Sequence, residues 1–369
     1  MRGVSVAVIG GGRWARALSV RLSQNLRRQR GKEQQLRRVM QYQPPPDLPR
    51  IQTYYDQPER TKAPAKAPPS ARSGGGDSTL QMSADALLFA AGEVYADTIE
   101  LNELVEADLV IMAIPAAKVK PLLETLRDVL KPRQCLLHAI GSFAPVIGAS
   151  GHTMMPISEL VRLETPLVHI GALSGPAMAE DLEEELPVAM LCGSPSAEAT
   201  ALVQKALMGP QLRIYTSPDL IGVELARALV GVMALACGVA DALGFGAAAR
   251  SLFISHSASE MQRLGMAFGG SEWTFYGPAG LGELIVATDR RGSPDFQLGR
   301  LLGRGVSLGD AYRQIDRACD GLNMVREAQL LGQRARINLP IINALHRWVS
   351  GKQDLRTSMT ELLENELFT

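Results

Sequence analysis

The segment from Asp219 to Gly246 constrains the fold more than any other part of the chain. It reads DLIGVELARALVGVMALACGVADALGFG, with no proline and with no charged residue between Ala228 and Ala240. Apolar residues lie on every side of a helix built on this sequence, which is typical of a helix buried inside a helical domain. The uncharged run, 13 residues long, is shorter than the roughly 20 residues that a membrane-spanning helix needs. We therefore expect one long core helix, ended by the glycines of LGFG.

Length and charge set the broad class of protein. A chain of 369 residues predicts about two domains at roughly 150 residues each. The formal net charge is +0 and the pI is about 7.0, so we expect neither a nucleic-acid partner nor an anionic membrane surface. Four widely spaced cysteines lack the spacing of metal ligands and indicate buried thiols in a reducing compartment: Cys135, Cys192, Cys237 and Cys319. We expect a cytoplasmic protein without a membrane span.

The N-terminal residues have the pattern of a dinucleotide-binding turn. A buried-strand sequence, Val4 to Ile9, runs into GGGRWA, and a helix follows to about Arg28. Gly10 would make the tight turn, Gly12 would let backbone N–H groups approach a pyrophosphate, and Ala15 would let the helix pack closely on the strand. The alternative is a glycine turn that binds nothing.

The next strand leaves the choice of dinucleotide open. Val39 to Tyr42 is the predicted strand, but Gln43 and three prolines follow it, and the nearest acid is Asp47. No acid therefore stands where one would accept the ribose hydroxyls, so the cofactor is NAD or NADP. Residues 44–77 are rich in Pro, Ala, Lys, Gly and Ser, and we expect a flexible insertion there.

Strand and helix patterns alternate up to about residue 215 and become helical from Asp219 onward. This order predicts an α/β fold, with an N-terminal Rossmann-type doubly wound sheet over residues 1–216 and an all-helical C-terminal domain over 217–369. Ligands of such sheets bind beyond the carboxyl ends of strands. Pro115-Ala116 and Ile140-Gly141 are therefore expected to face the cofactor.

Several blocks together resemble one family, the NAD(P)-dependent glycerol-3-phosphate dehydrogenases. They are VAVIGGGRWARAL, ADLVIMAIPA, LSGPAMAEDLEEELPVAM, GVELARALVGVMALACGVADALGFG and AGLGELI. The resemblance implies an active site in the cleft between the two domains, and dimers are common in the family, so a homodimer is a further expectation. It implies cofactor contacts at Gly10, Gly12, Arg13, Trp14, Ala15, Ala179 and Asp320, and substrate contacts at Gly175 and Ser293.

The residues that carry the chemistry of that family are replaced. Its two lysines correspond to Val230 and Ile140, and an asparagine to Gly231. The aspartate after GLG is Glu283, a nearby threonine is Ala287, and the arginine-asparagine pair that grips phosphate is Pro294-Asp295. Valine cannot move a proton, general acid–base help is typically worth about 10²–10⁴-fold, and a bidentate arginine is a strong phosphate ligand. Groups that could stand in are Arg227, Arg290, Arg291, His138 and His152, of which His152 is the best proton carrier; the alternative for each is a solvated or structurally satisfied side chain.

Three functions follow from this comparison of residues. The preferred hypothesis is a pseudoenzyme of the family that binds NAD(P) and has lost catalysis, so we assign no catalytic residue. The second is a dehydrogenase of a different, less anionic hydroxy substrate with a relocated proton carrier. The third is an active glycerol-3-phosphate dehydrogenase that acts on a small phosphorylated metabolite.

Overall fold

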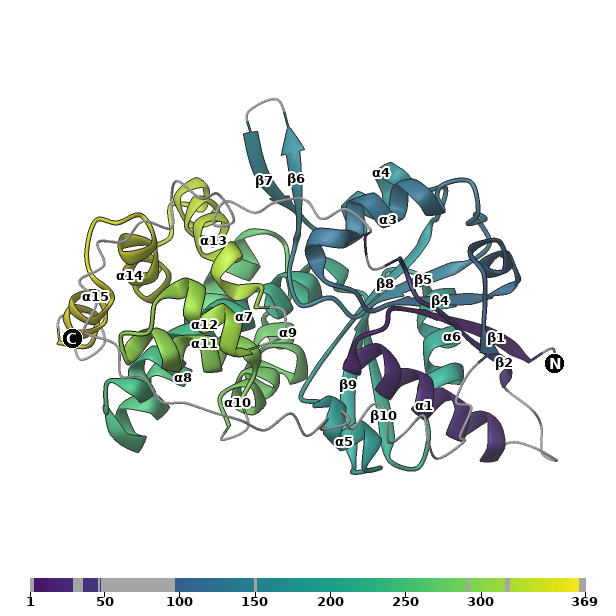
Figure 1. Cartoon of the computed structure of the whole chain (residues 1–369), viewed down its shortest axis with the longest axis horizontal. Coiled ribbons are helices and arrows are strands. Elements are labelled where there is room, and N and C mark those ends of the chain that lie inside the picture. Colours follow the sequence, from purple (N-terminus) through teal and green to yellow (C-terminus); the bar gives the residue numbers. More distant parts are fainter. Residues whose placement is uncertain are drawn as a thin grey trace, which may run out of the picture.

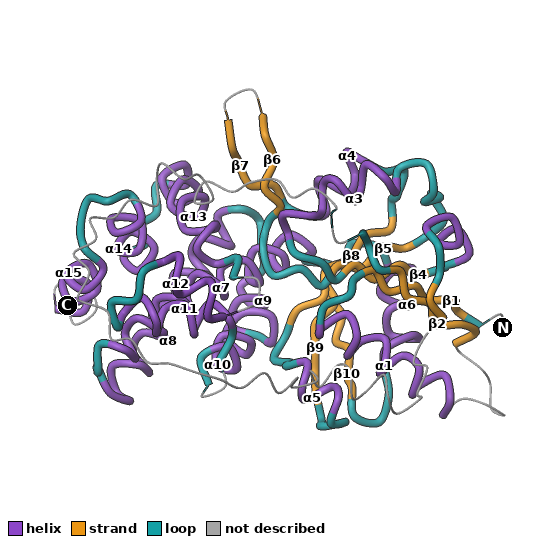
Figure 2. The backbone as a smooth tube through the Cα atoms, in the orientation of Figure 1, coloured by secondary structure: helices purple, strands orange, loops and turns teal. Residues whose placement is uncertain are grey.

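The structure is a computed structural model that describes residues 3–28, 36–45, 47, 97–148, 151–289, 292–315 and 319–364. A sheet-containing part and a helical part lie side by side (Figures 1 and 2). The sheet and its helices end with β10 (Leu212–Ser217) and the helical part starts with α7 (Leu220–Ala242). The division at 216/217 stays a prediction, and the expected insertion 44–77 lies almost wholly outside the described residues.

Eight strands form one twisted sheet in the order β10-β9-β8-β5-β4-β1-β2-β3. β1 pairs in parallel with β2 on one side and β4 on the other, while β8 and β9 pair antiparallel. The strands are β1 (Val4–Ile9), β2 (Leu36–Tyr42), β3 (Asp97–Thr98), β4 (Leu109–Met112), β5 (Cys135–His138), β8 (His169–Ser174), β9 (Val188–Gly193) and β10.

Helices cover both faces of this sheet, each over a separate apolar core. α1 (Arg13–Arg28) and α6 (Ala197–Leu207) pack on one face with Leu18, Leu22 and Val203. α3 (Val119–Leu126) and α4 (Ile157–Glu164) cover the other face. The sequence prediction of a Rossmann-type doubly wound sheet is confirmed.

A two-stranded hairpin was not predicted. β6 (Ala144–Gly148) and β7 (Gly151–Met155) pair antiparallel and project from the sheet part (Figure 1). Phe143 at its base is buried in the core of the helical part. Because the segment contains Pro145 and several glycines, it has the sequence signature of a loop.

The predicted core helix is confirmed as α7, which lies at the centre of the helical part. Asp219 caps it by accepting a hydrogen bond from Gly222 N at 2.8 Å. It packs against helices that follow it in the chain: α8 (Gly246–Ala267), α10 (Glu283–Ala287), α11 (Pro294–Gly303), α13 (Gly321–Ala335) and α14 (Pro340–Val349). The helix ends earlier than expected, at Ala242, because Gly244 has a φ of +79°.

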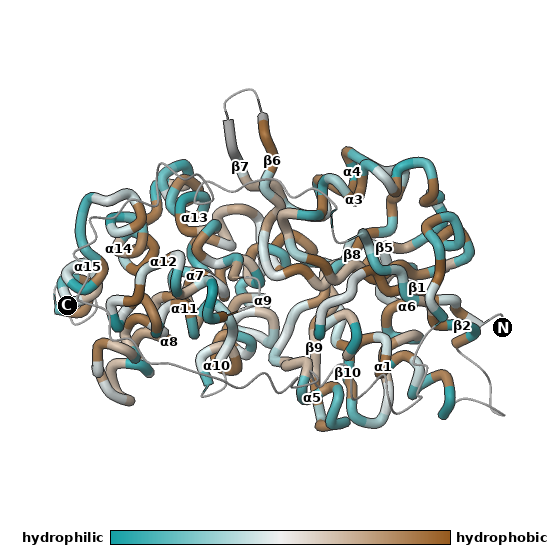
Figure 3. Tube along the Cα trace, in the orientation of Figure 1, coloured by the Kyte–Doolittle hydropathy of each residue, from teal (hydrophilic) through white to brown (hydrophobic). Residues whose placement is uncertain are grey.

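By length and composition, α7 is the one helix among the described residues that could cross a membrane, but 89% of its most apolar window is buried inside the protein. In Figure 3 its hydrophobic segments run through the interior of the helical part. The remaining elements are short: α5 (Ala179–Glu183), α9 (Glu272–Tyr276), α12 (Leu308–Ile315), α15 (Leu355–Leu362), 3₁₀ turns at Leu101–Glu106 and Ala116–Lys118, and a π turn at Pro278–Gly282.

Candidate active site

The turn between β1 and α1 has the shape that a dinucleotide needs. Gly10 has a φ of +142°, and a Cβ there would lie 2.3 Å from the carbonyl oxygen of Ala113. Ala15 is fully buried next to it. At Gly12 a Cβ would meet no atom within 4 Å, so the backbone at the start of α1 is open. These features fit a pyrophosphate held by the N–H groups of the first turn of α1.

Arg13 points from this turn towards α5. Its guanidinium forms ion pairs with Glu180 and with Glu183, the latter at 2.8 Å between Nη2 and Oε2. Trp14 packs against the core under α1, and Ala179 is the first residue of α5. The three residues therefore lie on the two helices beside the turn, and their contact with the cofactor stays a prediction.

The end of β2 presents amides in place of an acid. Gln41 Nε2 donates to the carbonyl oxygen of Gly10 at 3.0 Å, and the side chain of Gln43 approaches Gly11. An amide does not repel a 2′-phosphate as a carboxylate would, and it can still bond a ribose hydroxyl. Both NAD and NADP are compatible with this end of the sheet.

The two positions that correspond to lysines by the family resemblance are filled by buried apolar side chains. Ile140, after β5, is 4% exposed and belongs to the core on the α3 face of the sheet. Val230 of α7 is 1% exposed and belongs to the helical core. Neither side chain can move a proton.

Charged groups from both parts of the molecule meet beside these positions. We call this group the junction: Gly141, Ser174-Gly175, Arg227, Glu283, Asp295 and Asp320. It lies where the carboxyl ends of β5 and β8 meet α7, the edge at which ligands of open α/β sheets bind.

Arg227 and Glu283 form the ion pair of the junction. Arg227 Nη1 lies 2.5 Å from Glu283 Oε1, and Nη2 lies 3.3 Å from where a Cβ on Gly141 would be. Glu283 Oε2 accepts from Ser174 Oγ at 2.5 Å and from Gly175 N at 3.0 Å. Burial raises the pKa of Glu283, and the charge of Arg227 opposes this shift. The Glu283 carboxylate therefore neutralises the Arg227 guanidinium, which is less able to bind a phosphate group as a result.

Asp295 and Asp320 are the other two acids of the junction. Asp295 Oδ1 accepts from Gly321 N at 2.8 Å, and Oδ2 lies 3.1 Å from where a Cβ on Gly231 would be. Burial and the nearby charge of Asp320 raise the pKa of Asp295 to about 7. Burial raises the pKa of Asp320 to about 6, against the opposing effect of Arg227.

The two predicted substrate contacts have structural partners. The backbone N–H of Gly175 is bonded to Glu283, as described, and its φ of +140° favours glycine. Ser293 caps α11 by accepting from Phe296 N at 3.2 Å, which leaves its hydroxyl hydrogen available to a ligand. Their contact with substrate stays a prediction.

Of the groups that could stand in for the replaced residues, Arg227 belongs to the junction and His138 does not. His138 is buried, with Nε2 3.0 Å from Glu224 Oε1, and Glu224 also accepts from Ser158 N and Ser158 Oγ at 2.8 and 2.5 Å. His138 therefore joins the sheet to α7 and α4. Arg290, Arg291 and the side chain of His152 lie outside the described residues.

Sequence reasoning missed the pairing of Asp295 with Asp320. The two acids lie on different segments, and no spacing rule links them. Two glycines, Gly231 and Gly321, allow the close approach of these segments. A Cβ on Gly321 would lie 2.4 Å from the carbonyl carbon of Gly231 and 2.9 Å from Asp295 Oδ1. Within the described residues, no group of three or more His, Cys, Asp or Glu side chains is placed to hold a metal ion.

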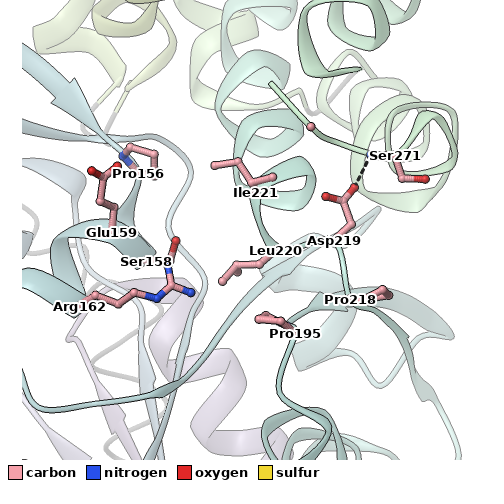
Figure 4. A pocket seen from close by; sticks show the side chains of 11 residues that line it. Pro156, Ser158, Glu159, Arg162, Pro195, Pro218, Asp219, Leu220, Ile221 and Ser271 are labelled. Atoms are coloured by element: carbon pink, nitrogen blue, oxygen red, sulfur yellow. Dashed lines mark hydrogen bonds between the residues drawn. The ribbon is translucent and has the colours of Figure 1, made fainter. Parts of the chain in front are cut away.

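A pocket of about 610 Å³ lies elsewhere, where α4 and the start of α7 meet the α8–α9 turn (Figure 4). Arg162 and Glu159 line it, and Asp219 there accepts from Ser271 N at 2.8 Å. None of its lining residues belongs to the junction or to the β1–α1 turn, so the pocket is a separate feature.

Comparison with known proteins gives one family. Sequence models described as the N-terminus and the C-terminus of NAD-dependent glycerol-3-phosphate dehydrogenase match residues 93–200 and 219–360. Glycerol-3-phosphate dehydrogenase [NAD(P)+] of Syntrophomonas wolfei is 31% identical over 79% of this chain and 85% of its own length. The enzyme of that name from Bacillus subtilis is 31% identical over 72% of this chain and 76% of its own length.

Solved structures show the same fold. The glycerol-3-phosphate dehydrogenase of Coxiella burnetii superposes with a TM-score of 0.76 at 23% identity, covering 98% of this chain and 99% of its own. A yeast glycerol-3-phosphate dehydrogenase gives a TM-score of 0.73 at 16% identity, covering 99% and 100%. The chain belongs to the NAD(P)-dependent glycerol-3-phosphate dehydrogenase family.

Proposed function

We propose that this protein binds NAD or NADP on the β1–α1 turn but does not turn over dihydroxyacetone phosphate or glycerol 3-phosphate at ordinary enzyme rates. Towards that substrate it is a pseudoenzyme. The observation that carries the proposal is the state of Arg227, which is paired with Glu283 at 2.5 Å and lies near two further acids.

The cofactor half of the proposal is supported by the open turn. Gly10 and Gly12 leave the backbone accessible, and the α1 N-terminus provides N–H donors and a positive dipole end. When bound, the cofactor would supply or accept the hydride. Ala179 and Asp320 are two further cofactor contacts that the family resemblance implies.

The proposed loss of turnover is supported by the charges of the junction residues. A phosphate dianion at the junction would meet one cation that is already paired, together with Asp295 and Asp320. Two unit charges about 4 Å apart interact by about 1 kcal/mol in water and about 4 kcal/mol near a protein surface. Repulsion of that size, added to the loss of a bidentate arginine contact, would weaken phosphate binding strongly.

The test is NADH consumption at 340 nm with dihydroxyacetone phosphate, for the wild type beside the double variant Ile140→Lys, Val230→Lys. We expect no turnover above background for the wild type, together with a thermal shift when NADH or NADPH is added. Rapid turnover by the wild type would establish an active glycerol-3-phosphate dehydrogenase and refute the proposal. A melting temperature that millimolar cofactor does not move would refute the cofactor half alone.

A second candidate function is a dehydrogenase of a different small substrate. The specific observation in its favour is Asp295, a partly exposed carboxyl at the junction that is able to hold a proton near neutral pH. The homodimer, the cytoplasmic location and a partner for the 44–77 insertion stay predictions.

A further inference from the structure

We infer that Asp295 is the proton donor for the reduction of a small carbonyl compound that carries no phosphate group, with Asp320 as the positioning residue that keeps it protonated. The inference rests on the cofactor half of the proposed function. It also shares with the proposed loss of turnover the exclusion of phosphate from the junction.

Asp295 is fixed at the edge of the sheet where ligands bind. It lies in the first turn of α11, after the cap residue Ser293. One carboxylate oxygen is held by Gly321 N at 2.8 Å, and the other faces α7 at Gly231. Asp295 as a residue is intermediate between buried and exposed, and we place the ligand against the second oxygen while the first is anchored.

Two glycines make this position possible. A side chain at Gly231 would bring its Cβ to 3.1 Å from Asp295 Oδ2, and one at Gly321 to 2.9 Å from Oδ1. Contacts under 3.4 Å are tight for a Cβ, so either side chain would press on the carboxyl group. Glycine at both positions therefore leaves the space between α7, α11 and α13 that the Asp295 carboxyl group occupies.

The surroundings of Asp295 favour its acid form. Burial and the charge of Asp320 raise its pKa to about 7, so about half of the groups hold a proton at neutral pH. The other titratable groups that face it are Arg227 of α7, Cys319 and Asp320 before α13, and Glu283 through its pair with Arg227. A general acid works best when its pKa lies near the operating pH.

The charge of the junction selects the class of substrate. Arg227 is held by Glu283, which leaves Asp295 and Asp320 without a cation of their own. A phosphate dianion is repelled there, whereas an uncharged hydroxyketone or hydroxyaldehyde loses nothing by charge and can accept a hydrogen bond from a carboxylic acid.

The proposed step balances in atoms and electrons. The carbonyl carbon accepts a hydride from NAD(P)H, and the C=O π bond breaks. The carbonyl oxygen takes the proton of Asp295, which gives an alcohol, NAD(P)⁺ and the Asp295 carboxylate. The carboxylate then regains a proton from water, and the repulsion from Asp320 favours this return.

The activity test uses dihydroxyacetone as the probe, with NADH or NADPH, followed at 340 nm between pH 5.5 and 9. We expect wild-type turnover that falls as the pH rises through about 7. Asp295→Asn keeps the acceptor for Gly321 N, and we expect it to lose about 10²–10⁴-fold of the rate. Asp320→Asn removes the like charge, so the midpoint of the profile should move to lower pH. Asp310→Asn, on exposed α12, is the matched control and should change neither rate nor profile.

A second readout does not depend on activity. In ¹³C NMR of protein labelled at aspartate carboxyls, one resonance should titrate near pH 7 and disappear in Asp295→Asn. The inference is overturned if the wild type does not reduce dihydroxyacetone, if Asp295→Asn keeps the wild-type rate, or if no carboxyl titrates near neutral pH. A thermal shift with NADH that persists in Asp295→Asn separates failure of this inference from failure of cofactor binding.

Discussion

Replacement of Arg227 by methionine tests the electrostatics of the junction. Methionine keeps most of the length of the side chain and removes its charge, so Glu283 stays in place without its cation. Glu283 is 8% exposed and retains two donors, Ser174 Oγ and Gly175 N. Breaking a fully buried ion pair costs about 3–5 kcal/mol. Because the Arg227 side chain is 33% exposed and two donors remain, we expect about 2 kcal/mol of lost stability at pH 8.

The penalty should depend on pH with a definite sign. The pKa of Glu283 is already raised in the folded protein by burial, so the folded state binds a proton more readily than the unfolded state. Loss of Arg227 raises this pKa further, and it raises those of Asp295 and Asp320 in the same direction. Stability is therefore lost as pH rises through the folded pKa values and regained as the acids take up protons. At pH 5.5 we expect the penalty to fall below about 1 kcal/mol.

The assay is urea unfolding followed by tryptophan fluorescence, for the wild type and Arg227→Met at pH 8 and pH 5.5. Arg300→Met is the matched control, because Arg300 Nε lies 3.0 Å from Asp241 Oδ2 and the Asp241 side chain is 34% exposed. Water can solvate that carboxylate, so we expect a loss of about 1 kcal/mol or less. An Arg227→Met penalty equal at the two pH values, or no larger than that of Arg300→Met, would refute the reasoning.

Three further substitutions, two of them with a matched control, test the fold around the site. Gly10→Ala places a Cβ 2.3 Å from Ala113 O at a φ of +142°, and we expect it to abolish the thermal shift with NADH. Gly305→Ala, with a φ of +85° and nothing within 4 Å, should cost only about 1–3 kcal/mol of backbone strain and should keep the shift. Ser158→Ala removes a 2.5 Å hydrogen bond to buried Glu224 and should lower stability by about 1–3 kcal/mol; Ser251→Ala, at an exposed bond to Ala247 O, should change it little. Gly321→Ala brings a Cβ to 2.4 Å from Gly231 and should cost about 1–3 kcal/mol, with the neutral-pH aspartate resonance shifted. A thermal shift with NADH that persists in Gly10→Ala, or a wild-type denaturation midpoint in Ser158→Ala or Gly321→Ala, would contradict the corresponding prediction.

Much of the fold follows from local patterns in the sequence. The uncharged run after Ala228 predicts a core helix because a charge inside it would need a buried partner, and α7 is that helix. The apolar runs at Val4 and Leu109 predict buried parallel strands, and β1 and β4 pair accordingly. The β6–β7 hairpin was missed because Pro145 and the flanking glycines have the composition of a loop.

The junction was only partly predictable. The replacements at Ile140 and Val230 are visible in the sequence, and so is the charge that Glu283 keeps. That Glu283 would take Arg227 as its partner depends on how α10 packs against α7, which no sequence spacing gives. The same holds for Asp295, whose anchoring by Gly321 brings α11 and α13 together.

The charges of α7 show how the two parts of the molecule are joined. Glu224 and Arg227 are one helical turn apart, so they lie on the same face of α7. Glu224 contacts His138 at the end of β5, and Arg227 lies beside Gly141, three residues further along that segment. Buried Glu224 and half-buried Arg227 thus each have a partner in the sheet part or in α10, as charges in a low dielectric require. One turn beyond Arg227, at Val230, the helix carries no charge, so Arg227 is the cation of α7 that opposes the raised pKa values of Asp295 and Asp320. Because Arg227 is paired with Glu283, burial and the charge of Asp320 outweigh the effect of Arg227 on Asp295, and the pKa of Asp295 is raised to about 7.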